Sequence, residues 1–540
     1  MADEMKKQIN KGILQLLDRA HISFIEQGDS IHFPCPLHTR PTGQLSNDFS
    51  VDINHGRGEC HYEGCKKILD RETLTDTLTD IADEELQKLS PFYGDTPSAL
   101  YAPTPIVTRT KTERKTSKKD APEIQPKEPK PRVAKCPVPT SDVSFEAWRQ
   151  TVRDNFPDLL LASETALAVV AQLLIKDITN PFALVLVDVP SSGKTIAINF
   201  FANIPELTYA SDKFTPASFV SNAANVKKEK LAEIDLLPRI QYKMFLIRDL
   251  ATLFSKRDDD LNEQLGILTR ILDGEGLNTD SGVHGQREYN GEYLFMLLAA
   301  STPVPPRVWK MMGNLGSRLF FLSINSREKT EDELVAQVSG TSYKEKERIC
   351  QTATKNLLYR LWNQYPDGVE WNKGADDADI KRIIVRCAKL LASLRGVINV
   401  WHDDFSGSYK YESPTIERPD RINQLFNNLA KGHALATGRA EINYDDLRFI
   451  LALTLDSAPL TRANIFKKLI ERGGSMTTTD IENELNCSKP TARNEMKKLE
   501  ILGICTSVER AGHDECEITL AADFEWFLSQ ECRDLGGVGR

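Results

Sequence analysis

The stretch VDVPSSGKT, Val187 to Thr195, decides which fold the middle of this chain adopts. It completes PFALVLVDV, a short apolar run typical of a buried strand in a parallel sheet, and it leads into IAINFFAN, which we expect to be a helix. In that setting, backbone N–H groups surround phosphates, the lysine reaches the outer two, and the next hydroxyl holds Mg²⁺. The sequence therefore predicts an ATP and Mg²⁺ site formed by Pro190, Ser191, Ser192, Gly193, Lys194 and Thr195.

One position departs from the usual pattern of such loops. Asp188 stands where the first glycine is expected. Glycine eases the turn at that point, but the proline and serines at 190–192 can form a tight turn as well. We therefore keep the nucleotide site as the interpretation and look to the rest of the chain for the other parts of an ATPase.

Composition limits the classes of protein to consider. The 540 residues are too many for one compact core and predict roughly three or four units. With 27% charged residues, no apolar run approaches the ~20 residues of a membrane helix, and MADEMKKQINKGILQLLDRAH resembles an amphipathic helix more than a signal peptide. We expect a cytoplasmic protein without membrane contact, whose ten cysteines stay reduced.

A linker divides the chain near residue 100. Tyr101 to Pro139 is rich in Pro, Lys and Thr and has little apolar periodicity, which predicts an extended, disordered spacer. Between Val107 and Lys135 there are ten Lys or Arg and four Asp or Glu. The positive excess could attract phosphates weakly, but a solvated spacer is the preferred interpretation.

Before the linker, four soft ligands have the spacing C-x2-H-x21-C-x4-C: Cys35, His38, Cys60 and Cys65. Two short pairs joined by a loop suit a closed tetrahedral Zn²⁺ site with a structural role. His55 and His61 are competing ligands, although His61 directly follows Cys60 and cannot easily reach the same metal. Free thiols near the surface are the alternative.

This arrangement resembles the CHC2 zinc-binding domain of bacterial DNA primases, in which a CPxH element begins the site and a C-x2-C pair ends it. Here the last pair is C-x4-C, a departure from that pattern. Nearby basic residues would give the module a surface suited to phosphates. Nothing downstream resembles the acidic primase core, so primer synthesis is not expected.

Residues from about 150 to 455 resemble an AAA+ ATPase, most closely the MCM-type helicases and the helicases of mobile elements. In YKMFLIRDLATLF, an apolar strand ends at Arg248-Asp249 where the family has Asp-Glu. The resemblance gives Asp249 an acidic role, either on the metal side or as the base for the attacking water. Because only one acid is present, hydrolysis could be slow.

Three further elements follow in the family's order. EYLFMLLAASTPVP resembles the sensor 1 strand, with Ser301 and Thr302 as candidates and Thr302 preferred. LGSRLFFLSI resembles the element with the arginine finger, which makes Arg318 the residue that would enter a neighbouring subunit's site. RPDRINQLF resembles the lid helix with its sensor 2 arginine, Arg421, or Arg418 as the second choice. The resemblance implies a homo-hexamer or another ring.

Two regions could contact DNA. The glycines of RILDGEGLNTDSGVHGQREYNG suit a hairpin in the channel of a ring, where His284, Gln286 and Arg287 could touch DNA, although a surface turn is nearly as good an interpretation. Residues from 459 onward are similar to a winged helix-turn-helix with a recognition helix from Lys489 to Glu500. Its first turns would enter the major groove. The contact candidates are Ser488, Lys489, Thr491, Arg493 and Asn494.

Protein contact is the alternative role for that helix. A stripe in the 376–396 segment, in contrast, is core: Ile380, Ile383, Ile384, Cys387, Leu390, Leu391 and Leu394.

The expected fold is therefore multidomain. It combines a small zinc-ribbon-like module (1–95), the basic linker (96–140), an α/β AAA+ P-loop ATPase core (141–330), a helical lid (331–458) and a winged helix-turn-helix domain (459–540).

Two functions fit these parts. The first is an ATP-dependent DNA helicase or translocase, acting on single-stranded or forked DNA in replication of a mobile element or plasmid, with other replication proteins as candidate partners. The second is a nucleotide-switched DNA-binding initiator or loader that hydrolyses ATP slowly and does not unwind DNA.

Overall fold

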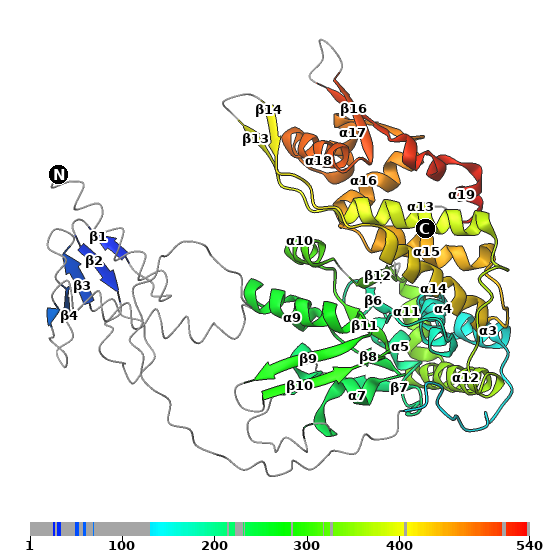
Figure 1. Ribbon diagram of the computed structural model, residues 1–540. Helices are drawn as coiled ribbons and strands as arrows, with labels where there is room; N and C mark the ends of the chain where they lie inside the picture. The colour runs from blue at the N-terminus through cyan, green and yellow to red at the C-terminus, as the bar shows by residue number, and fades with distance from the viewer. Residues whose placement is uncertain are drawn as a thin grey trace. The chain divides into compact units, whose positions relative to one another are not determined.

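The computed structural model describes two units, Met1–Glu123 and Ile124–Arg540 (Figure 1). In the first unit it describes five short strands. In the second it describes residues 130–536 apart from 213–214, 222–230, 232, 282–284, 317, 325–327, 404–407 and 510–514. All structural statements below concern these residues.

The described strands of the first unit form one antiparallel sheet. Its order is β1-β2-β3-β4-β5, and neighbouring strands in the sequence are neighbours in the sheet. The strands are β1 (Ile25–Gln27), β2 (Ser30–Phe33), β3 (Phe49–Asp52), β4 (Gly58–Cys60) and β5 (Ile68–Leu69). Val51 and Cys60, on paired strands, are buried.

The second unit is built on a parallel five-stranded sheet of order β12-β6-β11-β8-β7. The strands are β6 (Ala183–Val187), β7 (Thr208–Ser211), β8 (Met244–Ile247), β11 (Met296–Ser301) and β12 (Leu319–Ser323). The apolar runs that predicted strands before the phosphate loop, before Arg248-Asp249 and before Thr302 all form central strands of this sheet. The α/β expectation is confirmed at this level.

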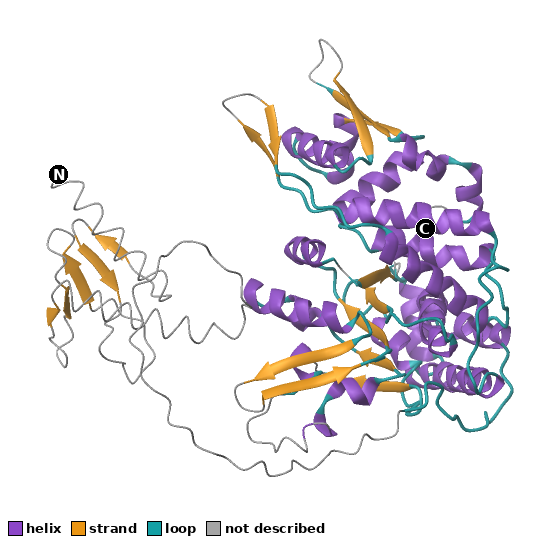
Figure 2. Cartoon of the chain, in the orientation of Figure 1, coloured by secondary structure: helices purple, strands orange, loops and turns teal. Residues whose placement is uncertain are grey.

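Helices cover both faces of the sheet (Figure 2). Along β6, Leu184 and Leu186 belong to one hydrophobic cluster, and Ala183 and Val185 belong to the other, as strand alternation requires. The second cluster is completed by α7 (Leu236–Ile240), α8 (Ala251–Phe254), α9 (Asp258–Ile271) and α10 (Pro306–Leu315).

The first cluster is much larger. It includes α3 (Phe145–Asn155), α4 (Leu160–Ala171), α12 (Tyr343–Gln364), α13 (Ala378–Arg395), α14 (Asp420–Ala436) and α15 (Leu447–Asp456). The predicted apolar stripe of α13 is buried there, which confirms it as core. Since the cluster also contains the core of the C-terminal helices, the predicted lid shares one hydrophobic core with the sheet and with the segment that follows it.

One segment has the length and apolarity of a membrane helix. It runs from Pro157 to Leu174, and 78% of it is buried inside the protein. Gly432 of α14 lies so close to α4 that an added Cβ would be 2.1 Å from the carbonyl oxygen of Ala168. We therefore interpret the segment as the central helix of a globular core.

The C-terminal segment contains a helix-turn-helix and a three-stranded sheet. Its elements are α16 (Leu460–Glu471), β15 (Ser475–Thr477), α17 (Thr478–Leu485), α18 (Lys489–Ile501), β16 (Cys505–Glu509), β17 (Cys516–Leu520) and α19 (Gln530–Asp534). Asn486 has a φ of +47°, which makes the tight turn between the two helices. The predicted recognition helix, Lys489 to Glu500, agrees with α18 to within one residue.

Smaller elements complete the second unit: α5 (Lys194–Asn199), the hairpin of β9 (Gly276–Ser281) and β10 (Gly285–Asn290), α11 (Glu331–Ser339), and the hairpin of β13 (Val400–Asp403) and β14 (Ser408–Tyr411). The predicted hairpin between the acidic strand and the sensor strand is therefore present. A second hairpin, β13–β14, joins α13 to α14 and was not predicted.

The outer edge of β12 is covered by side chains rather than by another strand. Ser457 Oγ accepts from the N–H of Phe321 (2.8 Å) and donates to its carbonyl (3.1 Å). Asp456 Oδ2 accepts from the N–H of Ser323 (2.7 Å), and Arg395 donates to the carbonyl of Leu319 (2.7 Å). Helices α13 and α15 are thus fastened directly to the sheet.

The Asp456 carboxyl gives this junction a pH dependence. Burial raises the pKa of Asp456 to about 6, against opposing effects of the Ser323 N–H and Lys467. A carboxyl whose pKa is higher in the folded than in the unfolded state destabilises the fold as pH rises from about 4 to about 6. We expect Asp456→Asn, which keeps an acceptor for Ser323, to raise the free energy of unfolding at pH 7.5 by about 1–2 kcal/mol. Urea unfolding at pH 7.5 and at pH 4.5 checks this, and an equal gain at both pH values would contradict it.

Candidate nucleotide site

The carboxyl ends of the five parallel strands meet at one edge of the sheet, where open α/β sheets bind ligands. Ser301 at the end of β11 pairs in register with Val187 at the end of β6. β11 lies between β6 and β8, so the predicted sensor lies between the phosphate loop and the Arg248-Asp249 pair. The fold therefore brings three predicted parts of the nucleotide site together.

The loop from Asp188 to Gly193 closes without a glycine at its first position. Asp188 Oδ1 accepts a hydrogen bond from the N–H of Val189 (2.7 Å), which ties the side chain to the turn. Positive φ angles occur instead at Ser191 (+67°) and Gly193 (+95°). At Gly193 an added Cβ would also lie 3.1 Å from Leu159 Cδ2, so glycine is needed there on two counts.

Lys194 begins α5 and folds back over the loop. Its Nζ donates to the carbonyl oxygens of Asp188 (2.8 Å) and Val189 (2.6 Å) and to Ser192 Oγ (3.2 Å). Burial lowers the pKa of Lys194, while the charges of Asp188 and Asp249 oppose that shift. An ammonium group enclosed by loop oxygens is placed to exchange those contacts for phosphate oxygens.

Asp249 and Arg248 point in different directions. Asp249 Oδ1 accepts from the N–H of Ala251 (2.7 Å), and its charge acts on Lys194. Arg248 instead pairs with Asp212 (2.8 Å) and donates to Asn199 Oδ1 (3.3 Å). Asp249 is thus the carboxylate of this strand end that acts on the loop lysine, and both acidic roles remain open for it.

Asp212 was missed by sequence reasoning. It follows the last residue of β7, at the same carboxyl edge, and its side chain is 75% exposed. The available signal was an acid directly after a short strand, in TYASDKF. It adds a third carboxylate to this edge, after Asp188 and Asp249, but one that is paired with Arg248.

The two sensor 1 candidates differ in exposure. Ser301 is the last residue of β11, and its buried Oγ has no hydrogen-bond partner among the described residues. Thr302 follows it and is exposed. Leu250 donates to the carbonyl of Ala300 (2.7 Å), which holds the Asp249 loop against this strand end. Of the two, Thr302 is therefore the one that a bound nucleotide could reach from the open edge.

Arg318 and Arg421 lie together, around Asp273. Arg318 donates to Asp273 Oδ1 through Nε (3.2 Å) and Nη2 (3.1 Å), and also to the carbonyls of Leu315 (3.1 Å) and Gly316. Arg421 Nη2 is 3.6 Å from the same oxygen of Asp273. Burial lowers the pKa of Arg318, and the nearby charge of Arg421 lowers it further.

This cluster is at the amino edge of the sheet, because Arg318 immediately precedes β12. The phosphate loop follows the carboxyl end of β6, and β6 is the strand that pairs with β12. Five strand residues span about 13 Å or more, so Arg318 and the loop of one chain are separated by at least that length. Asp273 has no sequence signal as a functional residue, and only the fold shows that two predicted site arginines share it.

The structure corrects the expectation for Arg287. Its side chain is buried, pairs with the buried carboxylate of Asp235, and donates to the carbonyl of Ser221. Tyr289 also donates to Asp235. Arg287 therefore fastens the β9–β10 hairpin to the start of α7 instead of facing solvent, because without the guanidinium the fully buried carboxylate of Asp235 would be an uncompensated buried charge. His284 lies outside the described residues, and Gln286 is exposed.

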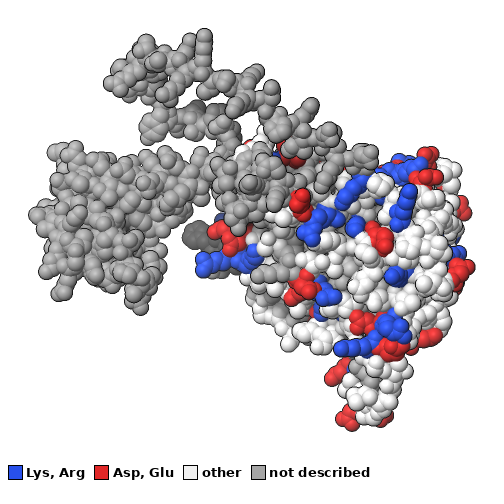
Figure 3. All heavy atoms as spheres, turned by 90° about the horizontal axis from the view of Figure 1, so that it is seen from below, with Lys and Arg blue, Asp and Glu red and all other residues white. Residues whose placement is uncertain are grey.

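The candidate DNA contacts on α18 are unequally accessible. Thr491 is exposed and its hydroxyl lies 3.0 Å from that of Ser488. Lys489, Arg493 and Asn494 are partly buried. Figure 3 views the molecule from below, the side away from α18 in Figure 1, and on that face Lys and Arg are interspersed with Asp and Glu.

Of the four predicted zinc ligands, the described residues include Cys60 alone. It ends β4 and is buried, in register with Phe49 of β3. Cys35, His38 and Cys65 lie outside the described residues, and the described part of the chain holds no cluster of three ligating side chains. A buried thiol at a strand end fits a structural metal ligand, and the zinc site stays a prediction.

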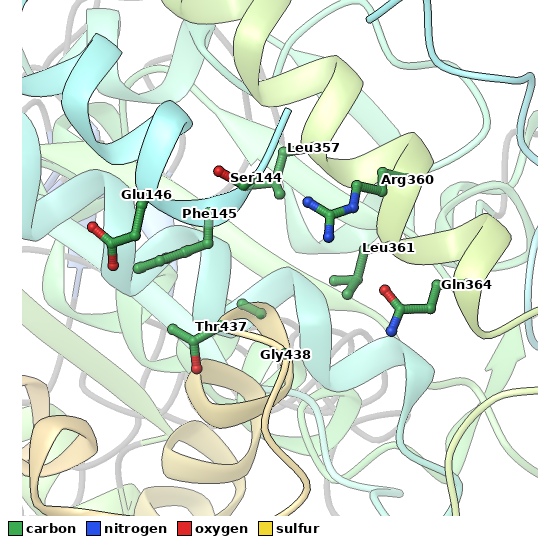
Figure 4. A pocket seen from close by; sticks show the side chains of 10 residues that line it. Ser144, Phe145, Glu146, Leu357, Arg360, Leu361, Gln364, Thr437 and Gly438 are labelled. Carbon is green, nitrogen blue, oxygen red and sulfur yellow. The ribbon is translucent and has the colours of Figure 1, made fainter. Parts of the chain in front are cut away.

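A cavity of about 210 Å³ lies elsewhere, between the start of α3, the end of α12 and the turn after α14 (Figure 4). Arg360, which lines it, pairs with Asp142 (3.3 Å) and donates to the carbonyl of Val143 (3.1 Å). None of the predicted site residues lines this cavity. It is therefore separate from the nucleotide site.

No protein-family model matches this chain, and no curated protein matches it either.

Proposed function

We propose that this chain is an ATPase of the AAA+ type that acts on DNA as a helicase or translocase, with MCM-type helicases as its nearest resemblance. One observation carries the proposal. Lys194 and Asp249 lie at the carboxyl edge of the sheet, whereas Arg318 and Arg421 lie together at the amino edge. A chain with this arrangement holds the two halves of a phosphoryl-transfer site on opposite sides.

The carboxyl edge supports nucleotide binding. Lys194 would hold the outer phosphates, and Thr195 would hold Mg²⁺ together with Asp249. Mg²⁺ supplies a positive charge that offsets charge developing on the phosphates during transfer. Thr302 would orient the attacking water from the neighbouring strand. These roles need no rearrangement of the strands.

The amino edge supports assembly. Arg318 and Arg421 share the carboxylate of Asp273, and the charge of Glu417 also acts on Arg318, so acids of the same chain hold both guanidinium groups at this edge. Neither arginine can serve the loop of its own chain across the length of a strand. A second copy whose phosphate loop faced this edge would bring nucleotide phosphates to these two guanidinium groups, and repetition of that contact builds a ring.

DNA binding is the second half of the proposal. Helix-turn-helix units of this form present their second helix to the major groove, and the N-terminal zinc module and basic linker would add phosphate contacts. Cytoplasmic replication of a mobile element or plasmid is the setting that this combination of parts favours.

The rival function is a nucleotide-switched initiator or loader with slow hydrolysis. Arg248 favours this function, because it stands where the family pattern has the first of two adjacent acids. It also forms an ion pair with Asp212. With Asp249 alone, the chain has to hold the metal and activate water using one carboxylate, or to recruit Asp212.

Turnover measurements separate the two functions. For a motor, we expect single-stranded DNA to stimulate ATP hydrolysis and a forked duplex to be unwound in the presence of ATP. Strand displacement with a non-hydrolysable ATP analogue is the control. If DNA does not stimulate hydrolysis and no strand is displaced, the helicase function is rejected and the nucleotide-switched function remains.

The zinc module gives an independent prediction. We expect one Zn²⁺ per full-length chain by elemental analysis and its loss in Cys60→Ser, because a four-ligand structural site rarely survives removal of one thiolate. Cys532→Ser, at a buried cysteine of the C-terminal segment, is the matched control and should retain the metal. A metal-free wild-type chain would rule out the site.

A further inference from the structure

The β13–β14 hairpin lies beside α18, the helix that carries the candidate DNA contacts (Figure 1). In the sequence it belongs to the helical layer, since it connects α13 to α14. Gly396, just before it, packs against the far end of α18: an added Cβ would be 2.4 Å from Leu502 Cδ2. The hairpin is therefore anchored where α18 ends.

The face of α18 that points away from its own core is partly covered. Ala492, Met496 and Leu499 are buried toward α17 and the β16–β17 sheet. Asn494 and Ile501 project from the opposite side of the helix, yet both are only partly exposed. The strand β13 is one of the described elements that contact α18.

The buried position of the Asn494 side-chain oxygen is energetically unfavourable. Its Oδ1 is buried and has no hydrogen-bond partner among the described residues. An orphaned buried acceptor costs about 1–3 kcal/mol. The asparagine amide is also the group that pairs with both polar atoms of an adenine edge in the major groove. The side chain is thus better satisfied by a base than by its present surroundings.

The strand β13 shows which side of the hairpin packs inward. Val400 is partly buried and packs against the shared hydrophobic core, whereas the next residue, Trp401, is 45% exposed. Alternation along a strand then places Val400 on the covered side and Trp401 on the outer side. Substitution of Val400 therefore tests how the hairpin is attached, and substitution of Trp401 tests the outer surface of the hairpin.

We propose that the outward face of α18 is a binding surface for duplex DNA and that β13–β14 and DNA compete for it. The inference rests on the proposed DNA-binding function and adds its regulation.

The test measures binding of a fluorescent 20-bp duplex to the full-length chain at one fixed salt concentration. Val400→Asp should release the hairpin and lower the Kd tenfold or more, and Trp401→Ala should leave it unchanged. Adding Asn494→Ala to Val400→Asp should remove the gain. Val400→Ser, with thermal unfolding recorded for each variant, serves if the aspartate variant fails to fold.

Two outcomes would overturn the competition while leaving DNA binding intact. Weaker binding in both Val400→Asp and Trp401→Ala would make the hairpin itself a DNA contact. An unchanged Kd in Val400→Asp, with weaker binding in Asn494→Ala alone, would show that α18 is already free. Absence of duplex binding in both the wild type and Val400→Asp would instead reject the DNA-binding role of this segment.

Discussion

Lys194→Ala should weaken nucleotide binding by roughly 100–1,000-fold. Lys194 Nζ already makes three hydrogen bonds inside the loop and is the enclosed cation of this strand edge. Two or more charge-assisted bonds to phosphate are worth about 3–4 kcal/mol, so affinity should fall by roughly 100–1,000-fold. Titration of a fluorescent ATP analogue measures the change directly.

The control for Lys194→Ala is Lys389→Ala, which removes the same charge from an exposed position on α13. Its affinity for the analogue should equal that of the wild type. If Lys194→Ala bound nucleotide with wild-type affinity, the loop from Asp188 to Thr195 would not be a phosphate site and the ATPase proposal would fail.

Arg318→Ala should keep nucleotide binding and lose turnover. An arginine supplied by a neighbour contributes about 10³–10⁵ in rate to phosphoryl transfer. The substitution also removes bonds to Asp273, Leu315 and Gly316, so some loss of stability is expected. Turnover and analogue affinity must therefore be measured below the unfolding temperature of the variant.

Mixing two inactive variants gives the sharper test. Chains with Lys194→Ala still have Arg318, and chains with Arg318→Ala still have Lys194. If sites form between chains, an equal mixture should recover activity at roughly a quarter of the interfaces, because both partners must be the right ones. A mixture as inactive as its components, with assembly confirmed by sedimentation, would place Arg318 in a structural role.

The sequence was sufficient wherever a local pattern determines the structure. The apolar run before Asp188 predicted a buried strand, and the helical period of residues 380–394 predicted a buried stripe; both are confirmed. The glycine requirement within the loop lies at Gly193, and the Asp188 side chain closes the turn itself. A missing glycine is therefore weak evidence against such a loop.

The sequence was insufficient wherever two distant residues meet. Arg287 and Asp235 are 52 positions apart, and nothing local indicates that the guanidinium turns inward. Asp273 lies 45 positions before Arg318 in a glycine-rich turn without any motif. Partners of this kind follow from how the strands and helices pack, so charged residues predicted as exposed contacts are the least secure part of such a prediction.

The covered edge of β12 limits how copies of this chain can associate. An open outer strand is a template to which another chain can add a strand, and that route leads readily to uncontrolled aggregation. Here Arg395, Asp456 and Ser457 already occupy backbone groups along that edge. Copies therefore cannot join by extending the sheet at β12. In the proposed assembly, contacts at the Asp273 end of the strand would be made by side chains, which can form and break more readily than a shared sheet.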